Sequence, residues 1–375
     1  MGSVTGYLET LDSRLGPINT VLPKVSVIVT NYNYSAYIED CLRSVSLQSY
    51  PDIECIVVDD NSSDNSAHII ERFIRNDRSD VDFKFVRHES TRGQYAAFRT
   101  GIARADGAFV SFLDADDLLL PEFLAEHVRV HLNYPPVAFT SSNQYQIDSK
   151  GQIVGGSHPD LQTQGTYRSV GTVSLRRSFW VWATTSSMMF RRTVLDYVLS
   201  DADDSFRKCA DNYVCHFADL LGGSILIPTL LGCYRRHQRN TFSNNPLIGG
   251  RLPTGDMSRH PAHDLVLHHI RARLFECHRQ FIALLGQQGF FQTLAKVTPL
   301  AQLYRASRSV GHLGAQGLRG AIKFGVFFAV LNLRTLVRAL KGRRAGYTLH
   351  ELEGIKRASN VVSYADYQRH HRDAK

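Results

Sequence analysis

The stretch Ala108-Phe-Val-Ser-Phe-Leu-Asp-Ala-Asp-Asp117 is the most informative about the architecture, because in it an apolar segment runs directly into a cluster of carboxylates. Residues 108–113 have the length and composition of a buried strand. The D-x-D sequence at its end places the carboxylates of Asp114 and Asp116 near one point, and Mg²⁺ or Mn²⁺ is commonly held by one or two carboxylates together with phosphate oxygens. We therefore expect a divalent cation here, with a helix N-cap cluster before Pro121 as the alternative.

The rest of the N-terminal half repeats the alternation of strand and helix. Apolar, β-rich runs predict the strands, and helical spacing of apolar residues predicts the connecting helices. The expected strands cover residues 25–30, 53–58, 83–86 and 108–113, and the expected helices cover residues 35–49, 68–75, 95–104 and 121–131. Crossovers of this length favour parallel pairing, so we expect an α/β fold with a doubly wound sheet and helices on both faces.

Polar residues follow three of these strands, at Thr30–Asn33, Asp59–Asp60 and Asp114–Asp117. Ligands of such sheets bind beyond the carboxyl ends of the strands, so we expect these groups to line one site. There, Asp60 can accept a hydrogen bond from a nucleobase N–H or a ribose hydroxyl, and Tyr32 can stack on a base. The alternatives are a helix cap for Asp60 and an ordinary turn for Tyr32.

The pattern changes after residue 135. We expect a strand at 137–141, short strand-like pieces in the Gly-, Ser- and Gln-rich segment 143–180, and a further element from Met188. A helix is expected at 210–221 and a strand at 224–234. The sequences G-x-G-x-x-G, G-x-x-x-x-G-K-[ST], H-E-x-x-H and G-x-S-x-G are absent, which argues against nicotinamide dehydrogenases, P-loop enzymes, zincins and α/β-hydrolases.

Charge is distributed unevenly along the 375 residues. The net charge is +8, and residues 251–375 alone hold 20 Lys and Arg against 7 Asp and Glu. A basic appendage indicates an anionic partner, either a membrane surface, an acidic polysaccharide or nucleic acid. Residues 318–341 have the basic and apolar composition of a helix lying on an anionic membrane, with packing on the protein or on a partner subunit as the alternative.

The lack of a recognisable targeting signal and of C-x-x-C pairs leads us to expect an intracellular location. Residues 1–20 lack a basic region followed by an apolar run, and no stretch reaches the ~20 apolar residues that span a bilayer. The six cysteines form no C-x-x-C pair, so we expect reduced, mostly buried thiols rather than a zinc site.

Taken together, these segments resemble family 2 glycosyltransferases with the GT-A fold. The resemblance covers about residues 24–132, with a weaker match in the second half. The matching pieces are Val25–Asn33, Cys41–Gln48, Ile56–Asp64, Gly93 with Gly101, and Phe112–Asp117 with Pro121, followed by Ser186–Arg191, Asp211 and Tyr234–His237.

The resemblance implies a donor site for a nucleotide sugar. Thr30 and Tyr32 line the nucleobase pocket in this comparison, and Asp60 holds the base. Asp114 contacts the donor ribose, and Arg92 lies in a stretch that often contacts the nucleotide.

The resemblance also implies a metal site and an acceptor site. Asp116 ligates a Mg²⁺ or Mn²⁺ ion that bridges the diphosphate, and His237 matches a histidine that reaches the metal in some members. Asp211 matches the general base of inverting members, with a helix cap as the alternative. Trp180 and Trp182 are candidates for acceptor binding because aromatic faces suit sugar rings, with a core role as the alternative.

The implied domains are an N-terminal extension (1–22), a GT-A glycosyltransferase domain (23–241), a linker (242–262) and a basic helical C-terminal region (263–375). The GT-A domain divides into a nucleotide-binding half (23–142) and an acceptor half (143–241).

The implied function is inverting, metal-dependent transfer of a sugar, with UDP-sugar as the expected donor, to a hydroxyl of a glycan or lipid-linked acceptor in cell-surface polysaccharide biosynthesis. We expect no nucleic-acid partner, and a cytoplasmic location with peripheral attachment to the inner face of the membrane. Two departures from the family pattern, Ala210 for Glu and Phe98-Arg99 for Arg-Asn, keep a degenerate sugar-nucleotide-binding scaffold open, and a nucleotidyltransferase is a rival enzyme. The sugar, the acceptor, the linkage and the oligomeric state stay open.

Overall fold

A computed structural model of the chain describes residues 22–134, 137–155, 168–170, 180, 182–199, 206–207, 210–237, 240, 261–298 and 346–347. The strands are β1 (Val25–Asn31), β2 (Ile53–Asp59), β3 (Asp82–Arg87), β4 (Phe109–Asp114), β5 (Leu118–Leu119), β6 (Phe139–Ile147), β7 (Ile153–Gly155), β8 (Arg168–Val170), β9 (Met188–Arg191), β10 (Ser224–Arg235) and β11 (Gly346–Tyr347). The helices are α2 (Ile38–Ser46), α3 (Ser66–Asn76), α4 (Gln94–Ile102), α5 (Phe123–Asn133), α6 (Arg192–Val198), α7 (Ala210–Gly222), α8 (Pro261–Glu276) and α9 (His278–Val297), with a 3₁₀ turn at Thr185–Ser187.

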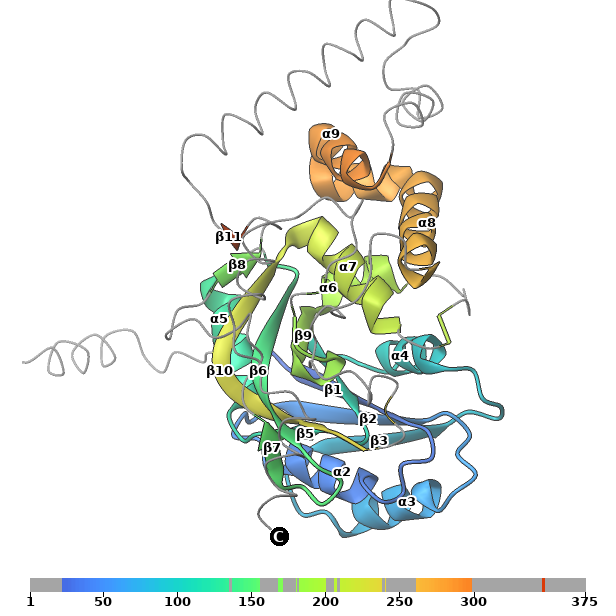
Figure 1. Cartoon of the computed structure of the whole chain (residues 1–375), viewed down its shortest axis with the longest axis vertical. Helices are drawn as coiled ribbons and strands as arrows, with labels where there is room; N and C mark the ends of the chain where they lie inside the picture. Colours follow the sequence, from blue (N-terminus) through green and yellow to red (C-terminus); the bar gives the residue numbers. More distant parts are fainter. Residues whose placement is uncertain are drawn as a thin grey trace, which may run out of the picture.

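The described strands form one sheet in the order β11-β8-β10-β6-β9-β4-β1-β2-β3, with β5 paired to β10 and β7 to β6 (Figure 1). Strands β4, β1, β2 and β3 are parallel. Strand β9 is antiparallel to both of its neighbours, β4 and β6. The α/β fold class is therefore confirmed, and parallel pairing between neighbours is interrupted where β9 enters the sheet.

Two hydrophobic cores lie on the two faces of the sheet. Alternate residues of β1 belong to different cores, with Val27 on one face and Ile28 on the other. Helices α2, α3 and α5 supply apolar side chains to the first core, and α4, α6, α7, α8 and α9 supply them to the second. Because both faces are covered, strands β1, β2 and β4 have largely continuous apolar sequences.

Helix α4 packs unusually close to β1. A Cβ atom added to Gly101 would lie 2.3 Å from Cγ2 of Ile28, so glycine is required at this crossing. Phe98 is buried and stacks on Phe112, with ring centroids 4.0 Å apart. The phenylalanine that departs from the family pattern is thus a core residue, and the neighbouring Arg99 donates to the carbonyl oxygen of Leu199.

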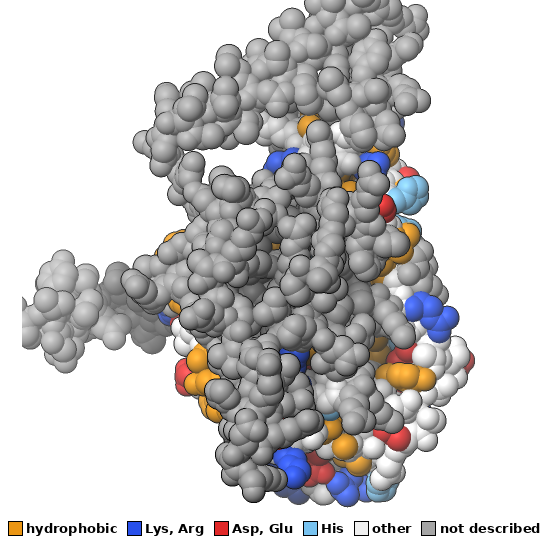
Figure 2. Space-filling model, viewed as in Figure 1, with side chains coloured by type: hydrophobic (Ala, Val, Ile, Leu, Met, Phe, Trp, Pro, Cys, Tyr) orange, Lys and Arg blue, Asp and Glu red, His pale blue; other side chains and the backbone are white. Residues whose placement is uncertain are grey.

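The surface over α2 and α3 carries side chains of both charge signs. Glu39 forms ion pairs with Arg43 in the same helix and with Arg72 in α3. Blue and red side chains accordingly lie side by side in this region of Figure 2. Exposed pairs of this kind contribute little to stability, about 0–1 kcal/mol each.

Several elements were not expected from the sequence. These are the short strand β5, the 3₁₀ turn before β9 and the helix α6, while β6 extends further than predicted. The predicted helical character after residue 263 is found in α8 and α9, which lie together beside α7 (Figure 1). The predicted linker at 242–262 falls almost entirely outside the described residues, and the basic segment 318–341 falls entirely outside them.

Within the described ranges, the structure contains neither a membrane-spanning helix nor a disulfide bond. No helix there is both long and apolar enough to cross a bilayer. The described cysteines (Cys41, Cys55, Cys215, Cys233 and Cys277) are unpaired, and four of these five are buried.

A buried carboxyl group, that of Asp219, lies near the end of α7 and makes the folding stability of the protein depend on pH. Asp219 accepts a hydrogen bond from Ser224 at 2.7 Å, and Ser224 accepts one from the indole of Trp182 at 2.9 Å. Burial raises the pKa of Asp219 to about 7, well above the pKa of an unfolded aspartate. Between these two values only the folded state binds the proton, so stability falls as the pH rises.

We expect Asp219→Asn to remove this pH dependence, because the amide still accepts from Ser224 but does not titrate. Relative to the wild type, the variant should gain stability between pH 5 and pH 8, by about 1.4 kcal/mol for each unit of pKa displacement. Denaturant unfolding at both pH values measures this difference. Asp196→Asn, an exposed acid in α6, is the control and should show no such trend. Parallel pH curves for wild type and Asp219→Asn would disprove the prediction.

Candidate active site

The carboxyl ends of β1, β2 and β4 bring the predicted polar groups together. Thr30 lies opposite Asp114 in the β1–β4 pairing, and Asn31 lies opposite Asp59 in the β1–β2 pairing. The hydroxyl of Thr30 donates to Oδ1 of Asp114 at 3.2 Å. Helices α2 and α3 cover one face of the sheet here, and α4 covers the other. The chain runs from β1 outward to β2 and β3 and then returns to β4 on the other side of β1, so the strand order reverses between β1 and β4. This is where ligands of doubly wound sheets bind.

Asp114 is half-buried in a crowded electrostatic environment. Burial, together with the negative charges of Asp116 and Asp211, raises its pKa to about 7. Hydrogen bonds from Thr30 and from the side chain of Gln94, the latter at 3.3 Å, oppose this effect. Clustered carboxylates of this kind gain stability when a cation neutralises them.

Asp116 meets residues from the C-terminal end of the domain. Its Oδ2 lies 2.9 Å from Nε2 of His237 and accepts a hydrogen bond from the side chain of Asn240 at 3.2 Å. The His237 ring stacks on Tyr37 with centroids 5.1 Å apart and meets the edge of Tyr34. The two predicted metal-site residues, 121 positions apart in the sequence, are therefore neighbours.

The donor set at Asp116 suits a hard divalent cation. Mg²⁺ is usually held by one or two carboxylates and completes its shell with water and phosphate oxygens, so it does not need three protein ligands. A carboxylate and an imidazole are compatible with Mg²⁺ or Mn²⁺. Among the described residues, three or more His, Cys, Asp or Glu side chains do not assemble into a metal-binding group. The residues fit an ion that is shared with a diphosphate.

Asp117 holds the turn of residues 114–117 in place through its hydrogen bonds. It was not predicted as a site residue from the sequence. It is fully buried, and its two oxygens accept hydrogen bonds from the hydroxyl of Ser186 at 2.7 Å and from the backbone of Arg235 at 2.8 Å. The same Ser186 hydroxyl accepts from the backbone of Asp114 at 3.1 Å. Burial raises the pKa of Asp117 well above its usual range. Its position in the D-x-D-D sequence was the one feature from which this role could have been predicted.

Asp60 binds the loop that precedes α4. Its carboxylate accepts from the backbone N–H groups of Arg92 at 2.8 Å and Gly93 at 2.7 Å, and lies 2.7 Å from Nδ1 of His88. The other nitrogen of His88 lies 2.9 Å from the hydroxyl of Thr100. Asp60 thus organises this loop, and its Oδ2, which accepts only from Gly93, retains a further lone pair for a ligand. His88 is a second residue that sequence reasoning missed.

Tyr32 lies in the turn between β1 and α2. Its side chain is 49% exposed, which leaves a face of the ring available to a ligand. The turn is held by Asn33, which has a φ of 61° and whose side-chain oxygen accepts from the backbone of Ser63 and Asp64 after β2. The two loops that should enclose a base are therefore tied to each other.

Asp211 is the second residue of α7 and lies close enough to Asp114 for the two charges to interact. Its Oδ2 accepts from the hydroxyl of Thr185 at 3.1 Å, and its Oδ1 accepts from the backbone of Asn212 at 2.9 Å. Burial raises the pKa of Asp211, as expected for a carboxyl that takes a proton during catalysis. Because its charge also raises the pKa of Asp114, the two carboxylates belong to one site.

The two tryptophans have different environments. Trp182 is completely buried and donates to Ser224, so it has no surface for a sugar in this structure. Trp180 is only partly buried and donates to the carbonyl oxygen of Ala183. The two indole rings pack edge to face, with their centroids 5.3 Å apart. A core role therefore describes Trp182, and acceptor binding stays a prediction for Trp180.

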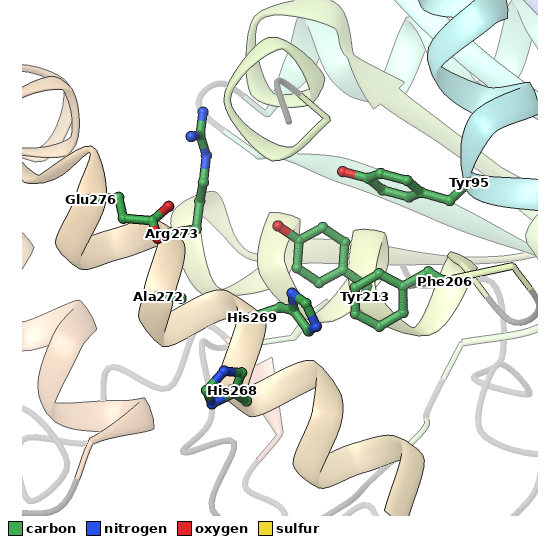
Figure 3. A pocket seen from close by; sticks show the side chains of 8 residues that line it. All are labelled: Tyr95, Phe206, Tyr213, His268, His269, Ala272, Arg273 and Glu276. Atoms are coloured by element: carbon green, nitrogen blue, oxygen red, sulfur yellow. The ribbon is translucent and has the colours of Figure 1, made fainter. Parts of the chain in front are cut away.

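A separate pocket of about 360 Å³ lies between α4, α7 and α8 (Figure 3). In Figure 3, Tyr95, Phe206 and Tyr213 form one wall, and α8 forms the other with Arg273 and Glu276. Phe206 and Tyr213 stack on each other with centroids 4.7 Å apart. The pocket contains none of the carboxylates of the candidate site, so we assign the site to the strand ends and not to this pocket.

The sequence of the N-terminal half matches a known family profile. Residues 26–199 match the profile of Glycosyl transferase family 2. This stretch of the chain is a family 2 glycosyltransferase domain. It contains Asp60, Asp114, Asp116 and the Thr185–Ser187 turn, while Asp211 and His237 follow it.

Two curated relatives extend the comparison. An uncharacterized glycosyltransferase of Nostoc sp. is 31% identical over 223 residues, which cover 58% of this chain and 66% of that protein. Poly-beta-1,6-N-acetyl-D-glucosamine synthase of Staphylococcus epidermidis is 35% identical over 134 residues, which cover 35% of this chain and 31% of that protein. The chain thus spans less than two thirds of either relative.

The architecture of the family 2 domain is the GT-A fold. The crystal structure of S. aureus TarS residues 1–349 in complex with UDP superposes with a TM-score of 0.50 at 18% sequence identity, covering 80% of this chain and 78% of that one. At this identity the likeness establishes the fold.

Proposed function

We propose that this chain is an inverting, metal-dependent glycosyltransferase that transfers a sugar from a UDP-sugar to a hydroxyl of a glycan or lipid-linked acceptor, in cell-surface polysaccharide biosynthesis. The observation that carries the proposal is the convergence of Asp60, Asp114, Asp116 and Asp211, from four separate segments, at the strand ends of a family 2 domain. The polysaccharide-synthase relative supports the cellular role, and the UDP complex of TarS makes UDP the first nucleotide to test.

In this proposal, the loops after β1 and β2 hold the nucleotide. Tyr32 stacks on the base, Asp60 accepts from the base while it orders the loop at Arg92, and Thr30 supports Asp114 against the ribose. Asp116 and His237 would hold a Mg²⁺ or Mn²⁺ ion, which would neutralise charge on the diphosphate leaving group.

Asp211 removes the proton from the acceptor hydroxyl as the acceptor oxygen attacks the anomeric carbon. The bond between that carbon and the diphosphate oxygen breaks, and the electron pair leaves with the nucleotide. The raised pKa of Asp211 makes it a stronger base than an ordinary carboxylate, while Thr185 holds it in position. Attack from the face opposite the diphosphate inverts the configuration.

Product analysis tests the proposed reaction. The full-length chain is incubated with a set of UDP-sugars and Mn²⁺, and the released nucleotide is identified by chromatography. Free UDP is the expected product. Pyrophosphate released in a parallel incubation with UTP and sugar 1-phosphates would instead support a nucleotidyltransferase, and absence of any product with every sugar nucleotide tried would support a binding scaffold.

We also propose peripheral attachment to an anionic membrane through the basic segment 318–341. Its composition supports this, since clustered Lys and Arg beside apolar residues bind acidic headgroups. Co-sedimentation of the full-length chain should be stronger with vesicles that contain phosphatidylglycerol than with pure phosphatidylcholine. Equal partitioning would end the proposal.

A further inference from the structure

A single side-chain amide connects the donor half and the acceptor half of the candidate site. The Nε2 group of Gln94 donates to Oδ1 of Asp114 at 3.3 Å, and its Oε1 accepts from the backbone N–H of Ala210 at 3.0 Å. Ala210 is the first residue of α7 and directly precedes Asp211. The amide orientation is fixed, because a backbone N–H can only donate and a carboxylate can only accept.

The backbone around Gln94 makes the same connection. Its N–H donates to the carbonyl oxygen of Arg207 at 3.0 Å, and the N–H of Tyr95 donates to that of Phe206 at 3.3 Å. The preceding residue, Gly93, has a φ of 90°, and a Cβ atom there would lie 2.6 Å from the Arg207 backbone. The start of α4 is therefore pressed against the segment that leads into α7, which gives the Gln94 side chain little freedom.

The same loop is anchored on the nucleotide side by Asp60, which accepts from the N–H groups of Arg92 and Gly93. Residues 92–94 thus contact the end of β2, the end of β4 and the start of α7. The side chain of Gln94 contacts both Asp114 and α7.

We infer that Gln94 is a positioning residue that holds the proposed general base, Asp211, in register with the donor-binding carboxylate Asp114. The inference rests on the proposed function. A bridged pair keeps the acceptor oxygen aligned with the anomeric carbon, and a misplacement of about 1 Å costs on the order of 10²-fold in rate. Hydrolysis of the donor by water does not require the acceptor to be aligned, so it depends less on the bridge.

The test compares transfer and hydrolysis in Gln94→Leu, which loses both hydrogen bonds. We expect the ratio of transfer to donor hydrolysis to fall about 100-fold, through kcat for transfer and not through the KM of the donor. A ratio equal to that of the wild type would overturn the inference. A wild type that neither transfers nor hydrolyses would instead contradict the proposed function, so the two failures are distinguishable.

Two further variants separate positioning from loss of stability. Gln48→Leu is the matched control, because Gln48 joins backbone groups of Ser44, Leu120 and Leu124 away from the site. It should lower the melting temperature and leave the ratio unchanged. Gln94→Glu keeps an acceptor for Ala210 but places a negative charge beside Asp114, so its ratio should stay low. Recovery of the wild-type ratio by Gln94→Glu would overturn the bridge.

Discussion

Replacing Asp211 by asparagine is expected to reduce sugar transfer about 10³-fold while the protein still binds the nucleotide sugar. Asparagine can turn its oxygen toward the backbone of Asn212 and its amide nitrogen toward the Thr185 hydroxyl, which can rotate to accept, so local geometry should persist. What is lost is the ability to take a proton, and general base catalysis contributes about 10²–10⁴-fold. Initial rates with saturating donor and acceptor measure the loss, and nucleotide binding by calorimetry checks that the donor site is intact.

The pH dependence of the wild type gives the same residue a second test. Burial raises the pKa of Asp211, and a base acts only when deprotonated. Activity should therefore fall as the pH decreases through a pKa that lies above the ordinary aspartate value, and this acidic limb should be missing from the residual activity of the variant.

A helix cap is the alternative role for Asp211, and α8 provides a control. Asp264 is an exposed acid in the first turn of that helix. If Asp211 acted only through the helix dipole, Asp211→Asn and Asp264→Asn would both cost about 0.3–1 kcal/mol of stability and neither would affect turnover. Unchanged turnover in Asp211→Asn would remove the general base from the mechanism.

Replacing Asp116 by asparagine is expected to lower kcat about 10³-fold and to shift the Mn²⁺ titration to higher concentrations. The amide oxygen can still accept hydrogen bonds, but the variant lacks the negative charge that a hard cation requires. A bound metal contributes several kcal/mol to stabilisation of the leaving group, which corresponds to a loss of this size. The measurement is the initial rate as a function of Mn²⁺ concentration.

Asp148→Asn is the control for this substitution, since Asp148 accepts backbone hydrogen bonds in the turn after β6 and lies outside the carboxylate cluster. It should retain the wild-type dependence on Mn²⁺. Full activity of Asp116→Asn at low Mn²⁺ would exclude the metal assignment at this residue.

The elements of the nucleotide-binding half could be predicted because their information is local. Continuous apolar runs identify β1, β2 and β4, since both faces of these strands are buried. Their order in the sequence, together with the rule for ligand sites in wound sheets, was sufficient to bring Thr30, Asp60 and Asp114 to one edge.

The remaining features depend on contacts between distant segments. Ser186 reaches the backbone of Asp114 across 72 positions, and Gln94 reaches Ala210 across 116. No periodicity or local motif encodes these pairs. The insertion of β9 between β4 and β6 is equally non-local, because it depends on which sheet edge is open when that strand pairs. Trp182 illustrates a different limit, since an aromatic residue in a polar segment is equally suited to a sugar site and to a core.

The most direct test is a crystal structure of the full-length chain with UDP and Mn²⁺, with the metal located by its anomalous signal. The proposed site predicts a manganese peak bonded to Asp116, with the uracil ring against Tyr32 and within hydrogen-bonding distance of Asp60. A nucleotide bound elsewhere, for example in the pocket beside Tyr213, or a manganese peak remote from Asp116, would contradict it.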